Sequence, residues 1–167
     1  MRMYIMTDLE GVACVTQWEN RADDGPWNTL RRARLSRLLA GEVNAAIDGL
    51  IAAGFDDIIV NDGHGAGSTI DYEVADPRAL YYHGLERPFW LPWLDESCAA
   101  TGAVGAHSKA GTPDGTLAHT MSEAIRRWSF NGIEVGETGL QALIAGYYGV
   151  PFVFAAGDAW LCREMEA

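Results

Sequence analysis

Short runs of apolar residues recur along the chain, each bounded by glycine or by acidic side chains. Four of these runs are continuous and rich in Val, Ile or Ala, over residues 3–7, 57–61, 103–106 and 151–156. Continuous apolar runs of this length are typical of strands that are buried on both faces, as in parallel sheets. The pattern therefore predicts four strands in the interior of the protein.

A longer segment between the first two runs has the periodicity of a helix. Within residues 28–53, apolar side chains recur every three or four positions, and Gly54 follows. This is the pattern of an amphipathic helix that ends at a glycine. A second helix is expected over residues 137–148, directly before the last strand. Strand, helix and strand in this order predict an α/β fold, a three-layer α/β/α arrangement with a mostly parallel sheet.

Two features after the third strand complete the expected fold. Asn131-Gly132 is the strongest short-range signal for a hairpin, and residues 123–130 and 133–135 flank it. We therefore expect a β-hairpin that projects from the sheet. Asp158 is a good N-cap, which predicts that a helix begins over residues 159–167.

Composition and charge narrow the class of protein. The 167 residues suit a single domain, and 12 Lys and Arg against 23 Asp and Glu give a net charge of −11, which disfavours nucleic-acid and anionic-membrane partners. No segment has the ~20 apolar residues of a membrane helix, and the first apolar run is too short for a signal peptide. Cys14, Cys98 and Cys162 form no CxxC pair. A cytoplasmic protein without a disulfide framework is expected.

Aromatic residues are concentrated in two segments that follow no strand or helix pattern. These segments, residues 18–27 and 81–94, contain Trp18, Trp27, Trp90 and Trp93 together with proline and charged residues. Large aromatic side chains in such segments favour burial in the core or in a subunit interface over a role in a substrate wall.

Acidic and histidine residues follow each of the four predicted strands. They are Asp8 and Glu10, then Asp62 and His64, then His107, and finally Asp158. Ligands of open α/β sheets bind at the carboxyl ends of the strands, so these side chains are expected to converge although they are far apart in sequence. Carboxylates and imidazoles gathered at one edge predict a metal site.

Each of these residues also has a structural explanation. A single Asp after a strand is usually a helix cap or a turn former, and a single His is more often hydrogen-bonded than metal-bound. The position of His64 and His107 at strand ends, with His119 twelve residues further on, favours a functional site. Residues 63–67 are rich in glycine but lack the Lys-Ser/Thr of a P-loop and the spacing of a dinucleotide fingerprint, which disfavours nucleotide binding.

Five motifs are spread over the whole chain: Asp8-Leu9-Glu10-Gly11-Val12, Val60-Asn61-Asp62-Gly63-His64, Gly105-Ala106-His107-Ser108, Leu117-Ala118-His119-Thr120-Met121 and Val135-Gly136-Glu137-Thr138-Gly139-Leu140. They resemble the motifs of the zinc-dependent D-aminopeptidases of the DppA type, a metallopeptidase family. Their order and spacing make the resemblance specific.

The resemblance implies a centre of two zinc ions per chain. Its expected protein ligands are Asp8, Glu10, His64, His107 and Glu137, with Asp8 as the bridging carboxylate and His119 as an additional catalytic histidine. It also nominates Glu137 over the neighbouring Glu134, which is expected to be an exposed hairpin residue. Members of this family form rings of five that stack into decamers and continue beyond the length of this chain. Residues 1–167 are thus expected to be one metallopeptidase catalytic domain, truncated at its C-terminus relative to the family.

The expected reaction is removal of the N-terminal residue of short peptides, including peptides that contain D-amino acids. Mixed carboxylate and imidazole donors suit Zn²⁺ with open coordination positions, which activates water for hydrolysis near neutral pH. His119 would pass a proton to the leaving amine. Two alternatives remain open: another dinuclear-metal hydrolase, such as an amidohydrolase or a phosphoesterase, and a non-catalytic peptide-binding assembly protein. Stereochemical preference depends on the pocket walls rather than on the metal ligands.

Overall fold

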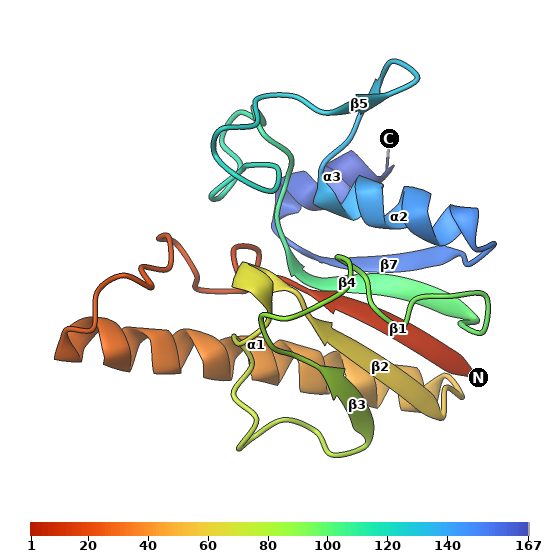
Figure 1. Cartoon of the computed structure of the whole chain (residues 1–167), viewed down its shortest axis with the longest axis horizontal. Helices are drawn as coiled ribbons and strands as arrows, with labels where there is room; N and C mark the ends of the chain where they lie inside the picture. The colour runs from red at the N-terminus through yellow and green to blue at the C-terminus, as the bar shows by residue number, and fades with distance from the viewer. Residues whose placement is uncertain (167) are drawn as a thin grey trace.

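The central element of the fold is a five-stranded sheet in which every neighbouring pair of strands is parallel (Figure 1). A computed structural model describes residues 1–166, apart from the side chain of Ala66. The strands lie in the order β3-β2-β1-β4-β7. Their bounds are β1 (Arg2–Thr7), β2 (Asp57–Asp62), β3 (Ala79–Tyr82), β4 (Ala100–Ala106) and β7 (Phe152–Gly157).

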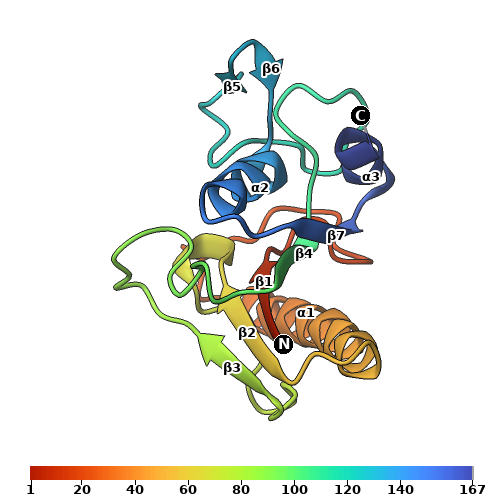
Figure 2. The same cartoon turned by 90° about the vertical axis from the view of Figure 1, so that its right-hand side faces the viewer.

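Helices cover both faces of this sheet. The long helix α1 (Pro26–Ala52) lies on one face, and α2 (Glu137–Tyr147) and α3 (Ala159–Glu166) lie on the other (Figures 1 and 2). A short 3₁₀ helix, η1 (His64–Ala66), follows β2. The predicted three-layer α/β/α fold with a parallel sheet is confirmed.

Strand β1 shows why the central strands read as continuous apolar runs. Met3 and Ile5 pack in the core beneath α1, whereas Tyr4 and Met6 pack in the core beneath α2. Successive side chains of a strand point to opposite faces, so a strand with a helix layer on each side must be apolar at every position. This sandwiching holds the carboxyl end of β1 in a fixed position at the centre of the sheet.

The predicted hairpin is present as β5 (Ser129–Phe130) and β6 (Ile133–Glu134), which project from the upper helical layer in Figure 1. Asn131 and Gly132 both have positive φ angles, of 52° and 85°, as a type I′ turn requires. The paired strands are shorter than predicted and their four residues are exposed. Without a second layer to cover it, the ribbon pairs only next to its turn.

Two differences from the predicted elements concern strands. β3 was not predicted, because residues 79–82 run directly into the aromatic-rich segment and carry no clear boundary. β4 begins three residues before the predicted apolar run. The predicted N-cap is confirmed, since Leu161 N–H donates to Asp158 Oδ1 at 2.7 Å.

Cys14, Cys98 and Cys162 are all free thiols. Over the described part of the chain, no helix combines the length and the apolar character needed to cross a membrane.

Candidate metal centre

The polar residues predicted to converge lie at the carboxyl edge of the sheet, where its strand order reverses. From β1 the chain passes through α1 to β2 on one side, and it later returns to β4 on the other side of β1. Crevices at such switch points are the usual ligand sites of open α/β folds. A pocket of about 360 Å³ opens here, and Asp8, Glu10, His64, His119 and Glu137 line it.

The first cluster joins the ends of β1 and β2. His64 Nδ1 lies 2.9 Å from Asp8 Oδ1 and 3.1 Å from Glu10 Oε2. One potential ligand atom from each of these three residues lies within 4.8 Å of the other two. This spacing is suited to a single metal ion bound by two carboxylates and one imidazole.

The second cluster joins the ends of β1 and β4 to the start of α2. His107 Nε2 lies 3.2 Å from Asp8 Oδ2 and 3.3 Å from Glu137 Oε1. His119 completes this group, with its Nε2 atom 3.8 Å from Glu137 Oε1. One potential ligand atom each from His107, His119 and Glu137 also lies within 4.8 Å of the other two. The structure therefore brings together all six residues that the sequence nominated.

Asp8 belongs to both clusters through different oxygen atoms. Its Oδ1 faces His64 and its Oδ2 faces His107. A carboxylate whose two oxygens face two separate groups of ligands has the arrangement that a bridging ligand requires.

Two buried atoms in these clusters have no hydrogen-bond partner among the described residues. They are Glu10 Oε2 and His107 Nε2, even though each has an oppositely charged group about 3 Å away. The Nδ1 atom of His107 lies 3.0 Å from the carbonyl oxygen of Ser108, which can only accept a hydrogen bond. In a neutral ring the lone pair is then on Nε2, which faces Asp8 and Glu137. Buried oxygen and nitrogen atoms whose lone pairs have no hydrogen-bond partner are suited to bind a divalent cation.

The electrostatics of the site link the histidines to the carboxylates. Burial disfavours the imidazolium forms, but the close contacts with Asp8 and with the neighbouring carboxylates outweigh it. They raise the pKa of His64 to about 12 and the pKa of His107 to about 11. Asp8 is also buried, yet the same two histidines hold its pKa well below the usual range. Burial is the largest influence on Glu10 and raises its pKa.

Glycine residues allow the loop after β1 to pack closely against the end of β4. Gly105 has a φ of +73°, and a Cβ atom there would lie only 2.2 Å from the carbonyl oxygen of Asp8. Gly11 donates its N–H to Gly105 O at 2.8 Å, and a Cβ on Gly11 would lie 1.7 Å from Ala106 O. Only glycine permits this approach, which places Asp8 between the two clusters.

Three other candidate residues have structural roles instead. Asp62 Oδ2 accepts hydrogen bonds from the N–H groups of residues 69 and 70 and from the Tyr72 hydroxyl. Asp158 caps α3 and also accepts from Thr116 N–H at 2.9 Å. Glu134 is exposed in the hairpin and pairs with Arg127. These assignments follow the structural explanation of an acidic residue after a strand or in a turn.

Several residues of the site were not found by sequence reasoning. Trp90 and Arg87 line the pocket, and the Trp18 ring meets the His119 ring edge-on at 5.0 Å. Glu19 contacts His64 at 3.1 Å; burial alone would raise its pKa, but hydrogen bonds from His64 and Arg21 lower it to about 2. All four residues lie in or beside the aromatic-rich segments, for which core or interface burial was favoured. Their irregular spacing carried no signal for this site.

The fold and the site define an α/β protein with a candidate two-metal centre at the sheet switch point. The sequence model of the D-aminopeptidases, peptidase family M55, matches residues 1–167. The chain therefore belongs to the M55 D-aminopeptidase family.

Two comparisons with individual proteins agree with this membership. The chain is 32% identical over 167 residues to a D-aminopeptidase of Bacillus subtilis strain 168. It is also similar, with a TM-score of 0.87 and 32% identity, to the solved structure of the Zn-dependent D-aminopeptidase DppA from Bacillus subtilis, described as a self-compartmentalizing protease. Each alignment covers 99% of this chain and 59% of the relative.

Proposed function

We propose that residues 1–167 are the catalytic domain of an aminopeptidase that binds two zinc ions and removes the N-terminal residue of short peptides. The observation that carries the proposal is the position of Asp8, whose two carboxylate oxygens face His64 on one side and His107 on the other. Family membership and the zinc dependence of the solved relative support the same activity.

The protein ligands divide into two sets around Asp8. Asp8, Glu10 and His64 would hold one ion, and Asp8, His107 and Glu137 would hold the other. When bound, the two ions supply Lewis acidity toward a peptide carbonyl and lower the pKa of a water nucleophile. Three protein ligands per ion leave positions open for substrate and water, unlike a closed structural site.

His119 is the proposed proton carrier of the reaction. Its Nδ1 atom lies 3.0 Å from the carbonyl oxygen of Leu117, which can only accept, so the neutral ring carries its proton on Nδ1. The Nε2 atom is then free to take up a proton and lies beside Glu137 at the pocket. From this position His119 would transfer a proton to the leaving amine.

Short peptides suit the dimensions and charge of the pocket. About 360 Å³ accommodates a few residues, and the pocket combines the acidic groups of the two clusters with the cation of Arg87 and the ring of Trp90. The substrate amino group would be attracted by the carboxylates. Preference for a D-residue at the N-terminus is part of the proposal, supported by the family to which the chain belongs.

We also propose that the chain assembles into rings of five that stack as a decamer. Trp27, Phe89 and Trp93 are exposed by 86%, 56% and 49% in the single chain. Large exposed aromatic side chains commonly mark protein interfaces. The description of the solved relative as self-compartmentalizing supports an enclosed assembly.

The activity is tested with the p-nitroanilides of D-alanine and L-alanine, each assayed with and without a zinc chelator. Hydrolysis that is lost with chelator and restored by Zn²⁺ is expected, with faster turnover of the D-substrate. Faster turnover of p-nitrophenyl phosphate than of either anilide would favour a phosphoesterase. Peptide binding without any hydrolysis by the zinc-loaded chain would favour the non-catalytic alternative.

A further inference from the structure

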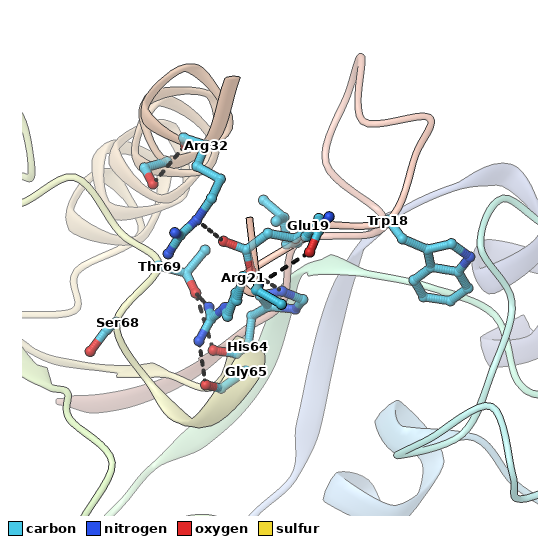
Figure 3. A network of polar contacts seen from close by, with 12 residues as sticks. Trp18, Glu19, Arg21, Arg32, His64, Gly65, Ser68 and Thr69 are labelled. Carbon is cyan, nitrogen blue, oxygen red and sulfur yellow. Dashed lines mark hydrogen bonds and ion pairs between the residues drawn. The ribbon is translucent and has the colours of Figure 1, made fainter. Parts of the chain in front are cut away.

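The loop between β1 and α1 reaches the outer side of His64. Its residue Glu19 has a side chain that is only 9% exposed, and Glu19 Oε2 lies 3.1 Å from His64 Nε2. Figure 3 shows Glu19 and His64 within one network of polar contacts. His64 is thus contacted on its Nδ1 side by Asp8 and Glu10, and on its Nε2 side by Glu19.

Two arginines hold the Glu19 carboxylate in place. Arg21 Nε donates to Glu19 Oε2 at 2.5 Å, and Arg32 Nε, from α1, donates to Glu19 Oε1 at 3.1 Å (Figure 3). A carboxyl group between two guanidinium groups is ionised and can only accept hydrogen bonds. The Nε2 atom of His64 must therefore be the donor in its contact with Glu19.

Arg21 also connects Glu19 to the backbone segment that carries His64. Its Nη1 donates to Gly65 O at 2.6 Å and its Nη2 donates to Thr69 Oγ1 at 2.7 Å. Thr69 Oγ1 in turn donates to the carbonyl oxygen of His64 at 3.1 Å. These hydrogen bonds fix the position of the loop relative to the segment after β2, so the position of the His64 ring depends on both.

We propose that Glu19 is a positioning residue that keeps the proton of His64 on Nε2 and leaves Nδ1 to bind the metal ion shared with Asp8 and Glu10. Hydrogen bonds from the outer nitrogen of a ligating histidine to a carboxylate fix the tautomer and ring orientation, and their loss typically lowers metal affinity. This inference rests on the proposed zinc centre, but it concerns a residue outside the proposed ligand set.

The first test compares zinc binding by the wild-type chain and the Glu19→Gln variant. The side chain keeps its length but loses its negative charge and is a weaker acceptor for His64, so the zinc affinity of the site formed by Asp8, Glu10 and His64 is expected to fall roughly 10- to 100-fold. Asp57→Asn is the matched control, because it removes a carboxylate from the Arg2 ion pair at the opposite end of β2. Competition with a fluorescent zinc chelator measures both variants, and Asp57→Asn is expected to match wild type.

A second measurement needs no substitution and distinguishes positioning from a purely structural ion-pair role. Nitrogen-15 NMR of the zinc-loaded wild-type chain reports which ring nitrogen of His64 carries hydrogen. A proton on Nε2, with zinc on Nδ1, is expected; zinc on Nε2 would overturn the inference. Zinc affinity that is unchanged in Glu19→Gln would also overturn it. A wild-type chain that binds no zinc would instead contradict the proposed function itself.

Discussion

The imidazole rings of His107 and His119 are stacked, with centroids 3.9 Å apart and planes 13° apart. The two rings nevertheless differ in their surroundings. The His107 side chain is 1% exposed and faces Asp8 and Glu137, whereas the His119 side chain is 14% exposed and lines the pocket. We assign His107, which contacts the shared carboxylate Asp8, as a metal ligand, and His119, which contacts Glu137 at the pocket, as the proton carrier.

The His119→Ala variant tests that separation. If His119 moves protons without binding zinc, turnover is expected to fall by roughly 10²- to 10⁴-fold while the zinc content stays at the wild-type value. Zinc content, melting temperature and kcat are measured on one preparation. Full activity in a folded His119→Ala chain would refute the proposed role, and loss of one zinc ion would reassign His119 as a ligand.

The Asp8→Ala variant is expected to lose both zinc ions and all measurable turnover. Among the described residues, Asp8 is the one whose oxygens face both clusters, so its removal would take a ligand from each ion. Asp158→Ala is a matched control at the end of β7: losing the α3 cap should cost about 1 kcal/mol of stability while zinc content is retained. Elemental analysis of both variants decides the prediction, and an Asp8→Ala chain with full zinc content would contradict it.

Zinc binding is expected to release protons and to weaken as the pH falls. The raised pKa values of His64 and His107, about 12 and 11, mean that both rings are protonated at neutral pH in the metal-free chain. Zinc must displace these protons, so binding at pH 7 should release about two per chain. Calorimetry in buffers of different ionisation enthalpy counts them, and heats that are independent of the buffer would contradict the prediction.

The same pKa shifts make the folded metal-free chain less stable as the pH rises, whereas zinc binding becomes stronger as the pH rises. A histidine whose pKa rises on folding stabilises the folded state fully below its unfolded pKa of about 6.5. That contribution is expected to decline as the pH rises from about 6.5 through 11 and 12. Urea denaturation of the metal-free chain across this range measures it.

Gly105→Ala is expected to destabilise the protein and to disturb the site. The added methyl group would meet both a φ of +73° and the carbonyl oxygen of Asp8 at 2.2 Å. Gly132→Ala is the matched control, because Gly132 has a φ of +85° with open space around it. Backbone strain alone should cost about 1–3 kcal/mol at either position. Gly105→Ala should lower the folding stability by more than this and should also reduce zinc affinity. A loss of stability equal to that of Gly132→Ala would contradict the role of close packing around Gly105.

Much of the fold was predictable because burial on both faces leaves a simple sequence pattern. The central strands were found for this reason, α1 was found from its three- and four-residue apolar periodicity, and the hairpin was found because Asn131-Gly132 favours a type I′ turn. Strand β3 was missed because it has only four residues and because its second half overlaps residues 81–94, which were interpreted as an aromatic-rich segment without a strand pattern.

The candidate site was predictable only where its residues follow strands or belong to recognisable motifs. Asp8, His64 and His107 have that signal. Glu19 and Arg87 do not, because they reach the site through long loops whose path depends on tertiary contacts. No periodicity in the sequence encodes such a path.

The most direct test of the account is the zinc stoichiometry of the wild-type chain after reconstitution and removal of loosely bound metal. Inductively coupled plasma mass spectrometry, normalised to protein concentration by amino-acid analysis, gives this ratio. The two clusters that share Asp8 predict two zinc ions per chain. A value of one or zero in a fully folded preparation would contradict the two-metal centre.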